Sequence, residues 1–198
     1  MEKIISLFQR DYDGDRLVRN EVVPGAEWVI AGEGVATRKW DGTCCLVRDG
    51  KLFKRYHCNE GQKLPAGFEL AERKEQKDIR GKDVVKLYGW VPVGDGPEDR
   101  WHREAVNRDG LADGTYELCG PKVQGNAENL SEHWLNKHGA CILEDAPRTF
   151  DELKEYFADP ECDIEGIVWH HPDGRMVKIK KKDFGFSRVT TPTEPRRG

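Results

Sequence analysis

A lysine followed two positions later by an aspartate–glycine pair, Lys39-Trp40-Asp41-Gly42, is the first stretch of this chain whose residue types could do covalent chemistry. It lies in a region that is typical of a β-hairpin and not of a helix. A lysine that has lost its proton is a nucleophile, so one interpretation of Lys39 is a covalent catalyst. The other is an ordinary surface lysine beside a tight turn, and the short pattern alone does not decide between them.

Two acidic residues follow in β-like segments, Glu117 within "TYELCG" and Glu165 within "IEGIVW". Each places a charged side chain at the end of a predicted strand. Glu165 has an interpretation as an ordinary structural residue, because it begins one arm of a predicted hairpin whose other arm carries lysines. It would then form only an ion pair across the hairpin.

Basic residues occupy two other predicted strands. Lys54 and Arg55 stand on the return strand of the first hairpin, while Lys178 and Lys180 share one face of a later strand. A free lysine has a pKa of about 10.4 and is a poor nucleophile at neutral pH. Cations around Lys39 would disfavour its ammonium form. The alternative for the later lysines is a solvated basic strand end, which is common.

Short strands joined by turns are the elements that must position these residues. Strand-like runs are predicted at residues 27–33, 43–56, 82–93, 114–120 and 139–143. Helices are predicted at 98–108 and 149–159, and the second begins with a capping box of Thr149 and Glu152. A hairpin is predicted at 164–184. Many strands in meanders with few helices predict an antiparallel α+β fold.

Composition places the chain among polar globular proteins. Its 198 residues are 37% hydrophobic and 34% charged, and no apolar run is long enough to span a membrane. The short apolar stretch at the N-terminus is followed at once by acids, which argues against a signal peptide. The six cysteines form no C-x-x-C pair, so we expect no zinc site and a reducing, cytoplasmic compartment.

The net charge of −4 is unevenly distributed. Residues 175–198 hold eight Lys or Arg against two acids, whereas the rest of the chain is acidic. A basic end on an acidic body favours local phosphate binding over general coating of nucleic acid. A solvated basic tail is the alternative, and residues 187–198, "SRVTTPTEPRRG", are predicted to be flexible.

The ordered series resembles the motifs of the covalent nucleotidyltransferases, the superfamily of ATP-dependent RNA ligases, DNA ligases and mRNA capping enzymes. "KWDG" matches the nucleophile motif, "YELCG" the third motif, "EGIVW" the fourth and "KIK" the fifth. The segment that begins at Glu117 and includes Gln124, seven residues later, is similar to the corresponding segment of the nick-sealing RNA ligases of phages and of the kinetoplastid editing ligases. "DGTCC" and "GWVPV…WHREA" are closer still to the 5′–3′ RNA ligase family of vertebrates, bacteria and phages. The resemblance covers roughly residues 28–186.

This resemblance implies a nucleotidyltransferase (ATP-grasp-like) domain of two antiparallel sheets that form a nucleotide cleft, flanked by a few helices. It implies one adenylation domain over residues 1–186, a flexible tail over 187–198 and no OB-fold domain. Lys39 would attack the α-phosphate of ATP to form lysyl-AMP. AMP would then pass to an RNA 5′-phosphate, and a 3′-hydroxyl would displace it. The implied cofactors are ATP and Mg²⁺ (or Mn²⁺), and the implied partner is RNA with a 5′-phosphate and a 3′-hydroxyl end. The implied process is RNA repair in the cytoplasm, with no membrane as a partner.

The resemblance also implies a role for each matched residue. Asp41 and Gly42 would shape the loop that presents Lys39, the nucleophile. The residues implied to hold the nucleotide also include Arg38 (through its backbone carbonyl), Lys54, Arg55, Glu117 (at the ribose), Gln124, Lys178 and Lys180. Glu165, together with Glu117, would hold the metal ion. The basic segment from Arg175 onward would help to hold the RNA 5′-phosphate.

Two departures from the family pattern bear on the function. The strand expected to carry an aromatic residue that stacks on the adenine reads "ACILED", so the base would contact Ile142 or Leu143. Whether the nucleotide substrate is ATP or GTP is therefore left open. Only eighteen residues follow Lys180, too few for an OB fold, which disfavours a capping enzyme. The alternatives are a DNA nick ligase or guanylyltransferase with the same lysine chemistry, or an inactive nucleotide- or RNA-binding module. The oligomeric state is not predicted.

Overall fold

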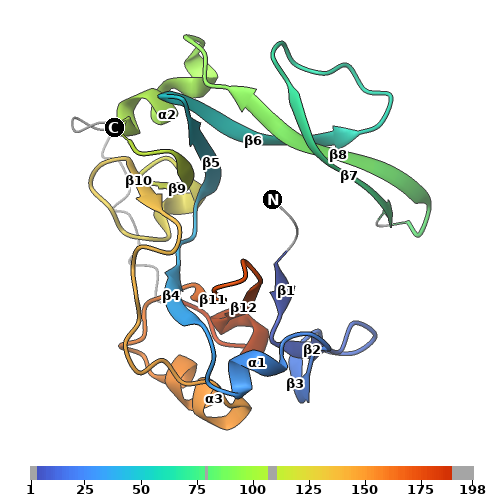
Figure 1. Ribbon diagram of the computed structural model, residues 1–198, viewed down its shortest axis with the longest axis vertical. Helices are drawn as coiled ribbons and strands as arrows, with labels where there is room; N and C mark the ends of the chain where they lie inside the picture. The colour runs from blue at the N-terminus through green and yellow to red at the C-terminus, as the bar shows by residue number, and fades with distance from the viewer. Residues whose placement is uncertain (1–3, 79, 107–110, 189–198) are drawn as a thin grey trace, which may run out of the picture. The chain divides into compact units, whose positions relative to one another are not determined.

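The computed structural model describes residues 4–78, 80–106 and 111–188, whose backbone is drawn in Figure 1. These residues form two compact units, each named here for its larger sheet. The six-stranded unit is Gly42–His138, and the four-stranded unit is Ile4–Asp41 together with 139–188. Lys39 therefore belongs to the four-stranded unit, while the glycine of its motif begins the six-stranded one.

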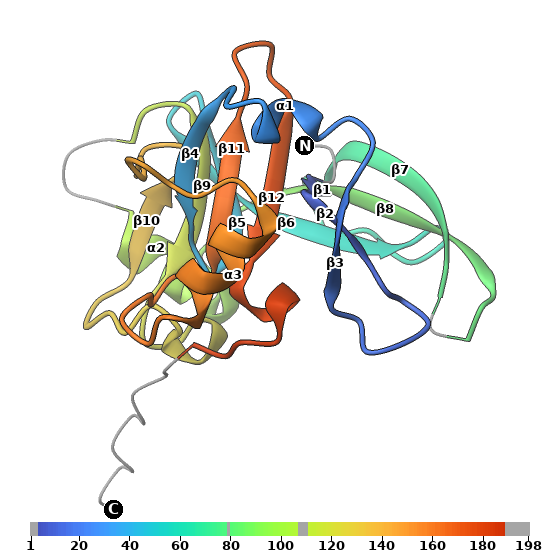
Figure 2. The ribbon, with the colours of Figure 1, turned by 90° about the horizontal axis from the view of Figure 1, so that it is seen from below.

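The main sheet of the four-stranded unit has the strand order β1-β12-β11-β4. Its strands are β1 (Ile5–Ser6), β4 (Val35–Lys39), β11 (Gly166–His170) and β12 (Met176–Lys180). Strand β11 pairs antiparallel with β4 and β12, which Figure 2 shows side by side, whereas β1 pairs in parallel with β12. The prediction of purely antiparallel sheets is thus wrong at β1. That strand is only two residues long and carries no alternating pattern of its own.

Helix α3 covers one face of this sheet. The remaining elements of the unit are β2 (Phe8–Arg10), β3 (Val18–Val22), α1 (Glu27–Ile30), α3 (Phe150–Ala158) and the 3-10 turn η3 (Lys181–Phe184). Leu153 and Phe157 of α3 are fully buried in one core with Ile167 and Ile179 of the sheet. The predicted capping box of α3 is confirmed, and the Glu152 carboxylate accepts a hydrogen bond from the Thr149 backbone N–H at 3.4 Å. Among the described residues, no helix is long and apolar enough to span a membrane.

The sheet of the six-stranded unit is antiparallel throughout, in the order β10-β9-β5-β6-β8-β7. Its strands are β5 (Thr43–Arg48), β6 (Lys51–Asn59), β7 (Glu69–Lys77), β8 (Asp83–Pro92), β9 (Gly114–Cys119) and β10 (Trp134–Lys137). Its helical segments are η1 (Pro97–Asp99), α2 (Arg100–Ala105) and η2 (Gln124–Asn126). One face packs against Ala105 of α2 through Cys45, Val47, Tyr116, Leu118 and Leu135. The other face is more polar and carries Glu117, Cys44 and Arg55.

Two predicted strands are wrong. Residues 27–33 contain helix α1, because Trp28 and Val29 are buried in the core and the Ala31 N–H bonds back to the Glu27 carbonyl at 3.0 Å. Residues 139–143 form no strand, and Ile142 makes only a single bridge to β4. In α1 the burial of Trp28 and Val29 overrides the local strand preference.

The other predicted elements are confirmed within the described residues, and the α+β class with them. Of the helix predicted at 98–108, α2 ends at Ala105 and Val106 is extended, so the prediction is wrong at residue 106, and residues 107–108 lie outside the described residues. Most of the predicted tail over 187–198 also lies outside them. A single nucleotidyltransferase domain over residues 1–186 stays a prediction.

Candidate active site

Three strands of the four-stranded unit place two lysines in one row. Gly166 of β11 is the register partner of both Lys39 on β4 and Lys180 on β12. Directly opposed residues in a sheet share a face, so both lysine side chains leave the same face, on either side of a residue that has no side chain. The same register confirms that Lys178 and Lys180 share a face.

Glu165, the residue before this row, bridges the two lysines. Its Oε2 accepts a hydrogen bond from Lys39 Nζ at 2.5 Å, and its Oε1 accepts one from Lys180 Nζ. The carboxylate is 10% exposed, and the two lysine side chains are 20% and 21% exposed. The ion pair expected as the alternative role of Glu165 is therefore present, and it extends to Lys39.

Electrostatics keep Glu165 ionised. Burial by itself raises the pKa of Glu165, but the positive charges of Lys39 and Lys180 outweigh burial and bring that pKa below its ordinary value. Asp41 responds in the opposite direction, since burial and then the negative charge of Glu165 raise its pKa against the opposing charges of Lys39 and Arg188. The unit thus holds one firmly ionised carboxylate beside one acid that is easier to protonate.

The glycines that follow Asp41 and Glu165 allow a neighbouring strand to approach closely. A Cβ built at Gly166 would collide with the Ile179 carbonyl oxygen on β12. A Cβ built at Gly42 would collide with the Leu118 carbonyl oxygen on β9 and would lie 2.9 Å from Cys119 Sγ. Only glycine therefore fits at these two positions, because the backbone of the neighbouring strand occupies the space that a side chain would need.

The segment after η3 returns to the loop that follows Lys39. Arg188 Nε donates to the Asp163 carboxylate at 3.1 Å, and its guanidinium lies 4.0 Å from the Asp41 carboxylate. Arg38, which points to the opposite side of β4 from Lys39, donates to the Asp163 carbonyl at 3.1 Å. The sequence motifs contain no indication of this cluster, because Asp163 and Arg188 lie outside them.

An aliphatic side chain lies on the same face as Lys39. Ile142 bridges Thr37, two residues before Lys39, and is 54% exposed. The Arg38 N–H donates to the Cys141 carbonyl at 2.8 Å, which holds this segment along the edge of β4. The residue predicted to meet the nucleobase is thus attached directly to the strand that carries Lys39.

Glu117, in the six-stranded unit, is held by its neighbours through both carboxylate oxygens. Its Oε1 accepts a hydrogen bond from the Gly42 N–H at 3.2 Å, and its Oε2 is 2.9 Å from His138 Nε2. His138 Nδ1 is in turn 3.0 Å from the Thr115 hydroxyl. Glu117 therefore anchors the glycine of the lysine motif. Sequence reasoning missed His138, because only the pairing of β9 with β10 brings it to Glu117.

Lys54 and Arg55 point to opposite faces of β6, and their surroundings differ. Lys54 forms an ion pair with Asp99, whose pKa is raised by burial but lowered overall by that lysine. The Arg55 guanidinium lies 5.5 Å and 6.0 Å from the ring centroids of Tyr88 and Trp90. Arg55 thus shares the polar face with Glu117, whereas Lys54 has a buried structural partner.

The predicted residues are divided between the two units. Gln124 is exposed in η2, and its side chain makes no hydrogen bond to the described residues. The four-stranded unit carries Arg38, Lys39, Asp41, Glu165, Lys178 and Lys180, while the six-stranded unit carries Gly42, Lys54, Arg55, Glu117 and Gln124. No group of three or more His, Cys, Asp or Glu that could hold a metal ion occurs among the described residues.

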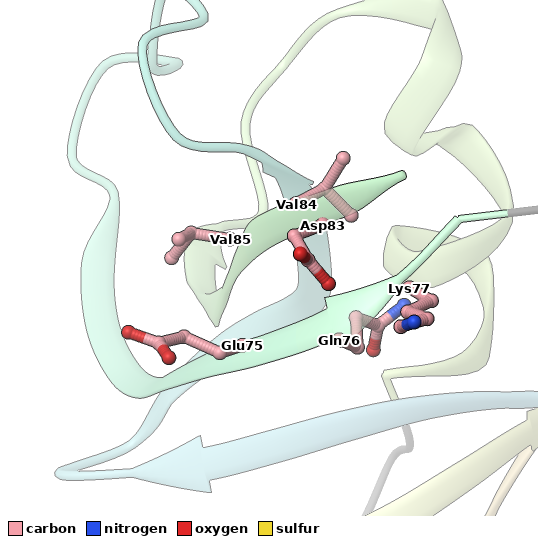
Figure 3. Close-up of a pocket in the computed structure, with 6 residues that line it drawn as sticks. All are labelled: Glu75, Gln76, Lys77, Asp83, Val84 and Val85. Atoms are coloured by element: carbon pink, nitrogen blue, oxygen red, sulfur yellow. The ribbon is translucent and has the colours of Figure 1, made fainter. Parts of the chain in front are cut away.

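A surface pocket of about 270 Å³ lies elsewhere in the six-stranded unit, at the end of the β7–β8 hairpin (Figure 3). It is lined by Glu75, Gln76, Lys77, Asp83, Val84 and Val85. None of the predicted site residues lines it, and we assign it no role in the chemistry.

Comparison with known proteins identifies the family. The family model described as RNA ligase 1 matches residues 92–194, a little over half of the chain. The chain belongs to the RNA ligase 1 family. A mouse (Mus musculus) protein named RNA ligase 1 is 28% identical over 219 residues, covering 77% of this chain and 67% of that protein. The rat (Rattus norvegicus) protein of the same name is 27% identical with the same coverage, and the zebrafish (Danio rerio) protein is 26% identical over 76% of this chain.

The segment matched by the RNA ligase 1 model contains the acidic residues and the later lysines of the candidate site. Glu117, Gln124, Glu165, Lys178 and Lys180 fall inside residues 92–194, whereas the Lys39 motif and the first hairpin precede them. The ion pairs of Glu165 therefore connect the family segment to Lys39.

Proposed function

We propose that this chain is an ATP-dependent RNA ligase in which Lys39 becomes covalently attached to AMP. The observation that carries the proposal is the row of Lys39 and Lys180 bridged by Glu165, in a member of the RNA ligase 1 family. The relatives named RNA ligase 1 support RNA as the strand to be joined. The ordered motifs support a nucleotidyltransferase domain.

The reaction runs in three transfers. Lys39 first gives its ammonium proton to solvent, because only the free electron pair of Nζ can attack. A bond then forms between Nζ and the α-phosphorus of ATP, and the bond from that phosphorus to the β-phosphate oxygen breaks, releasing pyrophosphate. An oxygen of the RNA 5′-phosphate next displaces the lysine amine from the adenylate. Finally a 3′-hydroxyl loses its proton, attacks the 5′-phosphorus and displaces AMP.

Cationic side chains stabilise the charge that develops in these transfers. Lys178 and Lys180 hold the α-phosphate on the face of the sheet that carries Lys39. Arg55 holds a phosphate or the ribose from the polar face of the six-stranded unit, and Glu117 binds the ribose. The ion pair of Lys54 with buried Asp99 argues for a supporting role for Lys54.

The base is held beside Lys39 by contacts of a different kind. Ile142 offers an exposed aliphatic surface on the face of Lys39, and the Arg38 backbone carbonyl accepts from the adenine amino group. Gln124, exposed after Glu117, contributes to nucleotide binding. An aliphatic platform gives less discrimination between purines than hydrogen bonds to a base, so the Arg38 carbonyl carries the preference for ATP over GTP.

The donor set fits a divalent cation that binds together with ATP. Mg²⁺ in such sites uses one or two carboxylates plus substrate phosphates, so a group of three protein ligands is not required. Glu165 and Glu117 are the residues that would hold it, and at Glu165 it would replace at least one lysine contact. When bound, the cation would neutralise charge on the phosphates.

The cysteines, all free within the described residues, suit a reducing cytoplasmic setting.

Covalent labelling tests the proposal. The protein is incubated with Mg²⁺ and ATP labelled at the α-phosphate, then separated on a denaturing gel. We expect label on the wild type and on Lys51→Ala, which removes an exposed lysine of the first hairpin, and none on Lys39→Ala. ATP labelled at the γ-phosphate should leave the protein unlabelled, because pyrophosphate departs. Label that persists in Lys39→Ala would refute Lys39 as the nucleophile.

The acceptor separates the alternatives. RNA and DNA with 5′-phosphate and 3′-hydroxyl ends are supplied separately to the labelled enzyme, and joined product is measured. Joining of DNA alone would identify a DNA nick ligase, and label from GTP alone would identify a guanylyltransferase. Nucleotide binding without any covalent label would identify a non-reacting binding module.

A further inference from the structure

Two lysines face each other directly on the polar face of the six-stranded unit. Lys74 of β7 is the register partner of Lys86 of β8, and β8 lies between β7 and β6 in the sheet (Figure 1). Like charges placed directly opposite on one face destabilise a sheet. Neither lysine side chain has an ion pair or hydrogen bond with the described residues, although both are half-buried. The pair therefore works against folding unless an anion lies between the lysines.

The lysine pair continues into a row of basic and aromatic side chains. His57 on β6 is the register partner of Tyr88 on β8, and their rings stack with centroids 5.7 Å apart. One row further, Arg55 is opposite Trp90 and lies over the Tyr88 ring. We call these five positions the basic face: Lys74, Lys86, His57, Tyr88 and Arg55. Along β8 the face extends from Lys86 to the position of Trp90, the register partner of Arg55, which is four residues or about 13 Å.

Acidic residues do not neutralise this face. Glu69 lies in the row of Trp90, but its carboxylate is paired with Arg48 at 2.6 Å. Glu72 lies opposite Tyr88 and forms no ion pair with Lys74 or Lys86 among the described residues. The remaining charged residues of β7 point to the other face of the sheet. The basic face thus keeps an excess of positive charge on a chain whose net charge is −4.

We propose that the basic face binds a single-stranded segment of the RNA substrate, with backbone phosphates at Lys74 and Lys86 and the reacting end toward Arg55. This inference rests on the proposed function, because it takes RNA as the polyanion to be joined. Phosphates between the two lysines relieve their repulsion, and the exposed ring of His57 offers a surface on which an unpaired base can stack. The two lysines are then binding residues that the folded state tolerates at a cost in stability.

RNA binding and its salt dependence test the inference. The affinity of a short 5′-phosphorylated single-stranded RNA is measured by fluorescence anisotropy at several salt concentrations. Each phosphate contact on a single strand contributes about 0.7 to the slope of log affinity against log salt, so Lys74→Ala/Lys86→Ala should lower the slope by about 1.4. At 0.1 M salt the same term corresponds to roughly a 25-fold loss of affinity. Lys77→Ala/Lys82→Ala removes two exposed lysines of the same hairpin outside the basic face and should change the slope little.

Stability distinguishes a binding role from a structural one. Lys74→Glu places a carboxylate opposite Lys86, and we expect a higher thermal midpoint together with weaker RNA binding. A lower midpoint would mean that the lysines support the fold. Equal losses of RNA affinity in Lys74→Ala/Lys86→Ala and in Lys77→Ala/Lys82→Ala would also overturn the inference. So would a salt dependence of RNA affinity that neither variant changes.

Labelling with ATP separates this inference from the proposed function. Both double-lysine variants should still acquire AMP at the wild-type rate, since neither removes a residue proposed to bind the nucleotide. A slower rate in Lys74→Ala/Lys86→Ala alone would mean that these two lysines bind the nucleotide and would refute RNA as their ligand. Wild-type protein that binds RNA through this face but never acquires AMP would refute the proposed function alone.

Discussion

Replacing Glu165 by glutamine tests the electrostatic centre of the candidate site. The substitution keeps the shape of the side chain and removes the one charge that Lys39 and Lys180 share. Breaking a fully buried ion pair by removing one partner costs about 3–5 kcal/mol. Here both lysines are partly exposed and can regain water, and the glutamine oxygen still accepts one hydrogen bond. We therefore expect Glu165→Gln to lower the free energy of unfolding by about 2 kcal/mol.

This loss predicts a measurable change in melting temperature. For a chain of this size, 1 kcal/mol shifts the midpoint by about 2–4 °C, so we expect Glu165→Gln to melt about 4–8 °C below wild type at pH 7. Thermal unfolding followed by tryptophan fluorescence measures it, since Trp169 and Trp28 are buried in the same unit. Glu161→Gln, which removes an exposed carboxylate nearby, should melt with the wild type.

The difference should also depend on pH in one direction. Burial raises the pKa of Glu165, the two lysines lower it more, and the folded value lies below the ordinary 4.5. The stabilisation by this carboxylate is therefore complete above about pH 4.5 and is lost as the pH falls through the lower folded pKa. The gap between wild type and Glu165→Gln should narrow in acid. Equal midpoints at pH 7, or a gap that persists unchanged in acid, would refute the reasoning.

Two further predictions concern the beginning of the six-stranded unit. Gly42→Ala should cost about 1–3 kcal/mol in urea unfolding, because the added Cβ meets the Leu118 carbonyl oxygen, whereas Gly94→Ala meets no atom closer than 3.7 Å and should be tolerated. Burial and the negative charge of Glu117 raise the pKa of the Cys44 thiol to about 11, so iodoacetamide at pH 8 should leave Cys44 unmodified until the protein is unfolded. Peptide mass spectrometry checks this, and rapid modification of the folded protein would contradict it.

The elements predicted well from the sequence are those with local signals. Helix α3 has a capping box, and the hairpin of β11 and β12 has a Pro-Asp-Gly turn between two strands rich in β-branched and aromatic residues. Strand β7, "ELAERKEQK", has no apolar alternation and pairs only with β8 at the edge of the sheet. It was not predicted, because its strand conformation depends on a neighbour and not on its own composition.

The candidate site was predictable in its members but not in its contacts. Period-two spacing was enough to place Lys178 and Lys180 on one face, and the motif order was enough to select Lys39 and Glu165. The bridge from Glu165 to Lys39 spans 126 positions and depends on the register of β4 with β11. His138 and Arg188 belong to no motif, and only the folded chain brings them to Glu117 and Asp41.

The position of Lys39 on a strand has a physical reason. At the end of β4 its neighbours across the sheet are fixed by backbone hydrogen bonds, so the separation of Lys39 from Lys180 does not depend on flexible side chains alone. The residue between them is glycine, because a Cβ at this position would collide with the Ile179 carbonyl oxygen, and the Glu165 carboxylate that pairs with both lysines comes from the residue before it. A helix would place partners three or four residues apart in one sequence segment. A sheet instead lets two lysines on different strands, and an acid that directly precedes the strand between them, share one small area.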